Sequence, residues 1–253
     1  MNRIFVTGDI HSEICTRFSN RNFPISRELD RSDIVIVAGD FGGVWDIQEG
    51  AQEKYGLDWL NNRNHLTLVV GGNHENWPRL LALPTIEKFG VKMGVIRENV
   101  LFIPNGTVFE YAGKTFWCFG GAMSTDKHQR VEGISWWPQE IPSYGEMLRG
   151  VEALDRVGNK VDIIITHTMP QESVRAFTES KGYHQDRVGD PVANYLSFIK
   201  KHNQFGMWFC GHFHTNQMYD GVHCLYEAIV DIGEYNSDVP INNYGKNHYN
   251  PLW

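Results

Sequence analysis

The sequence of 253 residues has few cysteines and no long apolar run. It contains no Cys-x-x-Cys pair, and its four cysteines are Cys15, Cys118, Cys210 and Cys224. Cysteines scattered in this way through a large chain are typical of a reducing compartment. The longest apolar runs, such as Ile34–Ala38 and Ile163–Ile165, have the length of strands, so we expect no membrane span. A first strand expected at Arg3–Thr7 leaves no room for a signal peptide, and we expect a cytoplasmic protein.

The sequence also lacks an excess of basic residues. Lys and Arg number 23 against 30 Asp and Glu, which gives a formal net charge of −7. A non-specific nucleic-acid-binding protein normally carries a basic face, so nucleic acid remains a candidate only as a substrate. An enzyme for phosphate compounds is not excluded, because a bound metal reverses the local field.

Strands and helices alternate along most of the chain, which favours a parallel or mixed sheet with helices on its faces. Strands are predicted at Arg3–Thr7, Asp33–Ala38, Leu66–Val70, Val161–Thr166 and Met207–Cys210, with a hairpin formed by Thr107–Tyr111 and Thr115–Phe119. Helices are predicted at Gln48–Asn61, Asn76–Lys88, Ser143–Val157 and Pro191–His202. We interpret residues 1–236 as one domain, with a substrate-facing insertion at 123–142 and a C-terminal tail at 237–253.

Polar residues beside glycines follow the predicted strands. The blocks, in chain order, are Gly8–His11, Gly39–Gly43, Gly71–Glu75, Thr166–His167 and Gly211–His214. Open α/β sheets bind ligands beyond the carboxyl ends of their strands. Each block alone is also common in ordinary turns, but their joint occurrence indicates a metal site. Carboxylate, amide and imidazole donors without cysteine suit Mn²⁺, Fe or Zn²⁺.

Together these blocks resemble the signature of the calcineurin-like metallophosphoesterase superfamily. That signature runs as Asp-x-His, Gly-Asp, Gly-Asn-His-(Asp/Glu), a single His, and Gly-His-x-His, and the match spans residues 8–214. The resemblance implies an α/β fold with four αββα layers. In this fold, two mixed β-sheets are flanked by helices, and a dinuclear metal site lies at the carboxyl ends of the strands.

The resemblance also implies roles for individual residues. One metal would be held by Asp9, His11 and His214, the other by Asn73, His167 and His212, and both by a bridging Asp40. Two divalent ions are expected, Mn²⁺ first, with Fe or Zn²⁺ as alternatives. A hydroxide bridging them would attack phosphorus in line, and His74 would protonate the leaving oxygen. Glu75 would orient His74 or an adjacent loop, or else serve only as a charge at a helix start.

The sequence departs from the phosphoprotein phosphatases of this superfamily at two arginines that clasp a monoester phosphate. The corresponding stretches read Gly39–Trp45 and Gly71–Glu75, and neither contains arginine. Lys127 and Arg130, in segment 123–142, are candidate substitutes for phosphate binding. The neighbouring Trp136–Trp137 pair would form an apolar or base-stacking wall. The alternative is that these tryptophans only pack a lid and that the charges are solvated.

The sequence therefore predicts a dinuclear metal-dependent phosphoesterase that hydrolyses a phosphodiester or a nucleotide-type substrate. The alternative is a phosphomonoesterase or protein phosphatase that uses Arg130 or Lys127 in place of the missing arginines. A non-catalytic metal-binding scaffold is a third hypothesis, disfavoured because every implied ligand position is intact. The sequence makes no prediction of oligomeric state.

Overall fold

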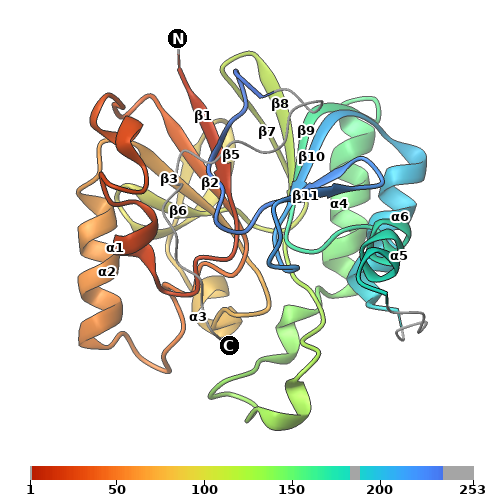
Figure 1. Cartoon of the computed structure of the whole chain (residues 1–253), viewed down its shortest axis with the longest axis horizontal. Coiled ribbons are helices and arrows are strands. Elements are labelled where there is room, and N and C mark those ends of the chain that lie inside the picture. The colour runs from red at the N-terminus through yellow and green to blue at the C-terminus, as the bar shows by residue number, and fades with distance from the viewer. Residues whose placement is uncertain (1, 183–188, 236–253) are drawn as a thin grey trace.

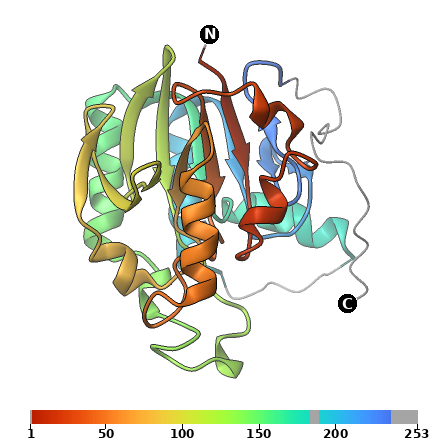
Figure 2. The same ribbon diagram turned by 90° about the vertical axis from the view of Figure 1, so that its left-hand side faces the viewer.

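Two β-sheets face each other at the centre of the molecule, and helices cover both outer faces (Figures 1 and 2). The structure, a computed structural model, describes residues 2–182 and 189–235. The predicted tail at 237–253 lies outside the described residues. The four αββα layers and the mixed sheets predicted from the sequence are confirmed.

The first sheet has seven strands in the order β13-β1-β2-β3-β6-β5-β4. Its strands are β1 (Ile4–Thr7), β2 (Ile34–Ala38), β3 (Leu66–Val70), β4 (Thr85–Lys88), β5 (Val91–Arg97), β6 (Val100–Phe102) and β13 (Val230–Asp231). Strands β1, β2, β3 and β6 run parallel, whereas β13, β5 and β4 are antiparallel to their neighbours. The carboxyl ends of β1, β2 and β3 therefore lie at one edge.

The second sheet has six strands in the order β11-β12-β10-β9-β8-β7. Its strands are β7 (Thr107–Tyr111), β8 (Lys114–Phe119), β9 (Lys160–Thr166), β10 (Gln204–Cys210), β11 (Gln217–Tyr219) and β12 (Val222–Cys224). Strands β8, β9, β10 and β12 are parallel, and the outer strands β7 and β11 are antiparallel. The predicted hairpin is β7–β8, and it turns at Ala112 and Gly113.

Helices α1 and α2 cover the first sheet, and α4, α5 and α6 cover the second (Figure 1). The α-helices are α1 (Ile14–Arg17), α2 (Ala51–Asn61), α3 (Trp77–Leu81), α4 (Tyr144–Arg156), α5 (Gln171–Ser180) and α6 (Pro191–His202). Short 3-10 helices occupy Pro24–Arg27, Lys127–Gln129 and Pro138–Glu140. None of the helices in the described part of the chain is long and apolar enough to cross a bilayer.

The central strands are buried on both faces, which explains their unbroken apolar sequences. In β1, Val6 points into the core between the two sheets, whereas Phe5 packs with α1 and α2 on the outer side. In β9, Ile165 joins the central core and Ile164 packs with α4 and α6. Packing on both sides fixes the strand ends, and so the positions of the polar blocks that follow them.

The predicted helix at Asn76–Lys88 is wrong over its second half. Helix α3 ends at Leu81, and Thr85–Lys88 forms β4, which pairs with β5. Pro84 has no N–H for a continuing helix. Phe89 and Gly90 both have positive φ and connect the two strands in a tight hairpin.

One buried histidine under α1 gives the fold a pH-dependent stability. His65 is fully buried against Phe18 and Phe23, and neither of its ring nitrogens has a hydrogen-bond partner among the described residues. Burial, aided by the nearby cations Arg63 and Arg31, lowers the pKa of His65 from 6.5 to about 3. The unfolded chain therefore binds a proton over this range that the folded chain does not.

We predict that the free energy of unfolding falls between pH 6.5 and about pH 3, with His65 contributing about 1.4 kcal/mol per pH unit. The replacement His65→Phe keeps an aromatic ring of similar size and removes this contribution. Urea unfolding of both proteins at several pH values measures the difference in slope, because all other titrating groups are shared. Parallel curves for the two proteins would contradict the prediction.

Candidate metal centre

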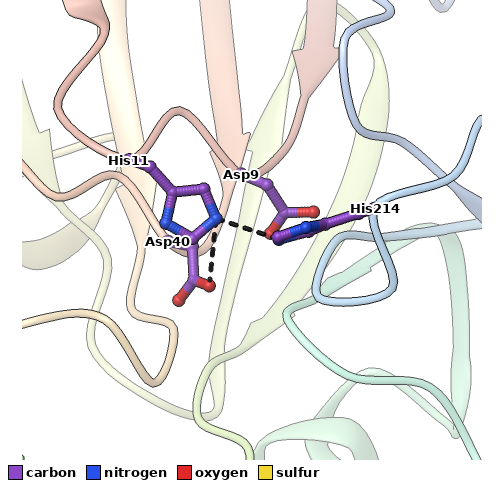
Figure 3. A group of neighbouring side chains, drawn as sticks. All are labelled: Asp9, His11, Asp40 and His214. Atoms are coloured by element: carbon purple, nitrogen blue, oxygen red, sulfur yellow. Dashed lines mark hydrogen bonds and ion pairs between the residues drawn. The ribbon is translucent and has the colours of Figure 1, made fainter. Parts of the chain in front are cut away.

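The polar blocks meet where the carboxyl ends of strands from both sheets come together. The candidate side chains are Asp9 and His11 after β1, Asp40 after β2, Asn73 and His74 after β3, His167 after β9, and His212 and His214 after β10. Four of them, from three different strands, are drawn in Figure 3. Residues more than 200 positions apart thus share one site because parallel strands place their ends at a common edge.

The site contains two groups of donor atoms that share one carboxylate. Asp9, His11, Asp40 and His214 form the first group, and Asp40, His167 and His212 form the second. In each group the donor atoms all lie within 4.8 Å of one another. In the first, His11 Nε2 lies 3.0 Å from His214 Nε2 and 3.7 Å from Asp40 Oδ2 (Figure 3).

Asn73 belongs to the second group by contact. Its Oδ1 lies 3.0 Å from His167 Nε2, and Asp40 Oδ1 lies 3.1 Å from the same nitrogen. The other ring nitrogen of His167, Nδ1, donates to the carbonyl of Ala38 at 2.9 Å. This bond directs Nε2 to the centre of the site, the arrangement by which proteins orient a metal-binding imidazole.

The carboxyl groups of the site are incompletely satisfied by protein groups alone. Burial raises the pKa of Asp9 to about 8, and Asp9 Oδ2 is buried without a hydrogen-bond partner among the described residues. Burial disfavours the cation at His167, but Asp40 and Asp9 outweigh it and raise the pKa of His167 to about 10. In turn, His167 lowers the pKa of Asp40 in spite of its burial. A divalent cation fits this site because it would neutralise both carboxylates and offer a partner to Asp9 Oδ2.

The backbone of the site is strained at most of the candidate positions. Positive φ angles between 47° and 69° occur at Asp9, His11, Asp40, His212 and His214. For residues other than glycine this left-handed conformation costs about 1–3 kcal/mol each, and it clusters at functional sites. Side chain to backbone bonds hold it in place: Asp9 Oδ1 accepts from His212 N, and Asp40 Oδ1 accepts from His74 N, both at 2.8 Å.

Two glycines are required by the close approach of the strand ends. A Cβ atom at Gly72 would lie 2.2 Å from Asp40 Oδ1 and 2.9 Å from His167 Nε2. A Cβ atom at Gly39, where φ is +82°, would lie 2.2 Å from Nδ1 of His167. The glycines of these blocks thus make room for the donor atoms themselves.

Glu75 ties two loops of the site together. It is fully buried, and its carboxylate accepts hydrogen bonds from the backbone N–H groups of Gly42 and Gly72. Of the roles considered from the sequence, the structure therefore supports orientation of adjacent loops. Glu75 also precedes Asn76, which caps α3, so it is not within that helix.

The segment at 123–142, here called the arm, projects beyond the sheets (Figure 1). Its residue Arg130 contacts His74 of the site. Arg130 Nη2 lies 3.0 Å from His74 Nε2, and the same guanidinium makes two bonds of 2.8 Å to Asp126. Lys127 is exposed. Trp137 is buried against Trp45, whose indole stacks on His74 with centroids 5.7 Å apart.

Some residues that hold the loops of the site in place could not be predicted from the sequence, because nothing in their local pattern marks them. Arg17 is the clearest case. Its guanidinium donates to the hydroxyl of Thr7 at 2.7 Å and to the carbonyls of Gly8, Asp9 and Tyr226 at 2.6–3.2 Å. It therefore holds the turn that carries Asp9 against a loop from the other end of the chain.

The chain belongs to the calcineurin-like phosphoesterase family, whose model matches residues 2–216. Members of this family are generally metal-binding hydrolases of phosphate esters, and the two donor groups described above agree with it. No curated protein matches the chain. Among solved structures, the crystal structure of TT1561 from Thermus thermophilus is similar, with 14% identity and a TM-score of 0.46. The similarity covers 89% of this chain and 88% of that one.

We predict that Arg17→Met destabilises the protein by about 3 kcal/mol, because it leaves several buried oxygens without their charged donor. The change also releases the turn at Asp9, so phosphoesterase activity falls more than the unfolded fraction explains. Chemical denaturation and activity at matched folded concentration measure both effects. Arg21→Met is the control, since Arg21 is exposed nearby. Equal stability of the two variants would contradict this role for Arg17.

Proposed function

We propose that this protein is a dinuclear metal-dependent phosphodiesterase, acting on a diester or nucleotide-type substrate. The observation that carries the proposal is that two donor groups share the carboxylate of Asp40. Two cations held close together need a common anionic ligand to offset their repulsion, and Asp40 lies in both groups. Asp9, His11 and His214 would complete one ion's ligands, and Asn73, His167 and His212 the other's.

Divalent ions bound here, Mn²⁺ first among the candidates, would polarise the phosphate and activate a water molecule. The chain's own residues would do the rest. His74 is half-buried at the edge of the donor groups, with its ring 4.9 Å from that of His11. Its backbone N–H donates to Asp40 Oδ1, so its backbone is held by the same carboxylate that joins the two groups. This position suits a proton donor to the leaving oxygen.

The charge beside His74 supports a diester substrate. Arg130 is the guanidinium that contacts His74, and its charge is offset by the bidentate pair with Asp126. A monoester phosphate carries a charge close to −2 and is normally held by unopposed arginines, whereas a diester carries −1. The half-buried indole of Trp45, stacked on His74, further suits a substrate with an organic group next to the phosphate, whereas Trp137 is buried and packs against Trp45.

The first test compares hydrolysis of bis-p-nitrophenyl phosphate and p-nitrophenyl phosphate with Mn²⁺ present. We expect faster cleavage of the diester and loss of both activities in Asp40→Asn, which retains the size of the side chain and removes its charge. Faster cleavage of the monoester would favour the phosphomonoesterase alternative. Full Mn²⁺ occupancy without turnover of either ester would favour a non-catalytic scaffold.

A second prediction concerns the pairing of Arg130 with Asp126. Asp126→Asn removes the offsetting charge and keeps the shape, so we expect kcat/KM for the monoester to rise relative to that for the diester. Arg130→Ala should lower kcat/KM for the diester by about 10- to 100-fold, the value of one charge-assisted hydrogen bond. Gln129→Ala, in the same exposed turn of the arm, is the control. An unchanged kcat/KM in Arg130→Ala would remove this residue from the site.

A further inference from the structure

We infer that Ser124 and Glu140, both on the arm, are positioning residues that fix the side-chain amide of Asn73. The inference rests on the proposed metal binding, because the orientation of this amide decides whether oxygen or nitrogen faces the second donor group. Three buried side chains lie next to one another here. Asn73 is 4% exposed, Ser124 2% and Glu140 1%, so solvent has little access to the bonds between them.

The three side chains form a directed chain of hydrogen bonds. The carboxylate of Glu140 accepts twice from Ser124: Oε1 from the backbone N–H at 2.8 Å, and Oε2 from the hydroxyl at 2.5 Å. Asn73 Nδ2 lies 3.2 Å from Ser124 Oγ. On its other side, Asn73 Oδ1 lies 3.0 Å from His167 Nε2.

The donors and acceptors permit one orientation of the amide. A carboxylate can only accept, so the hydroxyl proton of Ser124 is used on Glu140. The lone pairs of Ser124 Oγ are then what Asn73 meets, and only the NH₂ end of its amide can donate to them. The carbonyl end, Oδ1, must therefore face His167 and the second donor group, which is the orientation that a cation requires.

Backbone contacts at Gly121, just before the arm, hold the hydrogen-bond relay formed by Asn73, Ser124 and Glu140 against the first sheet. A Cβ atom at Gly121 would lie 2.3 Å from the carbonyl oxygen of Glu140, so the backbone just before the arm closely contacts the far end of the arm. Gly121 N also donates to the carbonyl of Gly71, in the same loop as Asn73. The arm is thus attached beside the residue that it orients, and its docking is coupled to the geometry of the second donor group.

Glu140→Gln tests the direction of the hydrogen bonds from Asn73 through Ser124 to residue 140, with almost no change in the shape of the side chain. The Gln carbonyl is needed by the backbone N–H of Ser124, so its NH₂ group faces the hydroxyl and donates to it. The hydroxyl proton is then free to point at Asn73, and the amide loses its preferred orientation. Ser124→Ala removes the relay altogether, whereas Ser124→Thr retains a hydroxyl and should restore it.

The measurement is Mn²⁺ binding to the full-length protein, followed by the electron paramagnetic resonance signal of free Mn²⁺. We expect two ions to bind the unaltered protein. In Glu140→Gln and Ser124→Ala, one ion should bind about 10- to 100-fold more weakly, as found for residues that orient metal ligands, while the other is unchanged. The double variant should be no weaker than Ser124→Ala alone, because both changes act through one bond. Glu132→Gln, at an exposed site on the arm, is the matched control.

The outcomes separate this inference from the proposed function. If the unaltered protein binds two ions and both variants bind them equally well, the positioning role is overturned and the metal site stands. If the unaltered protein binds no Mn²⁺, the proposed function and this inference both fail. Circular dichroism establishes that each variant is folded, and should Glu140→Gln not fold, Ser124→Ala and its Thr counterpart decide the question.

Discussion

The carboxylate of Asp40 is the interaction on which the site depends. It accepts from the backbone of His74, lies 3.1 Å from His167 Nε2 and belongs to both groups of donor atoms. Its surroundings are built to bring it there, since a side chain at Gly72 would displace it and Asp40 itself adopts a left-handed backbone. One buried charge thereby joins elements from both sheets, and a change at Asp40 is a change to the whole site.

Burying these carboxylates and straining the backbone beside them both cost free energy, which the folded structure around the site must offset. Two buried carboxylates lie together, and burial raises the pKa of Asp9 to about 8 while its Oδ2 has no partner among the described residues. Strained φ angles of the kind seen at Asp9 and Asp40 persist only where the surrounding structure fixes them. Arg17 does so here by donating to the carbonyls of Gly8 and Asp9, and Glu75 does so by accepting from two backbone N–H groups of the neighbouring loops.

The site is not formed by the strand ends alone, because the arm also contacts it. The arm reaches two consecutive residues after β3 by different means: Arg130 contacts the ring of His74, and Ser124 receives the amide of Asn73. The first contact concerns the substrate's charge, and the second the orientation of a donor atom. A single segment therefore contacts both the residue proposed to act on the substrate and a residue proposed to bind metal.

The family, the alternation of strands and helices, and the blocks that meet at the site could be predicted from the sequence, because strand-end glycines and polar residues are local patterns. The sequence did not reveal that Thr85–Lys88 forms a strand, since that depends on pairing with β5. Nor did it mark Arg17, whose partner Tyr226 lies 209 residues away, or Glu140, whose partner Ser124 lies 16 residues away on the arm. These contacts form only in the folded chain, because a hydrogen bond between segments that the fold brings together leaves no period or motif in the sequence.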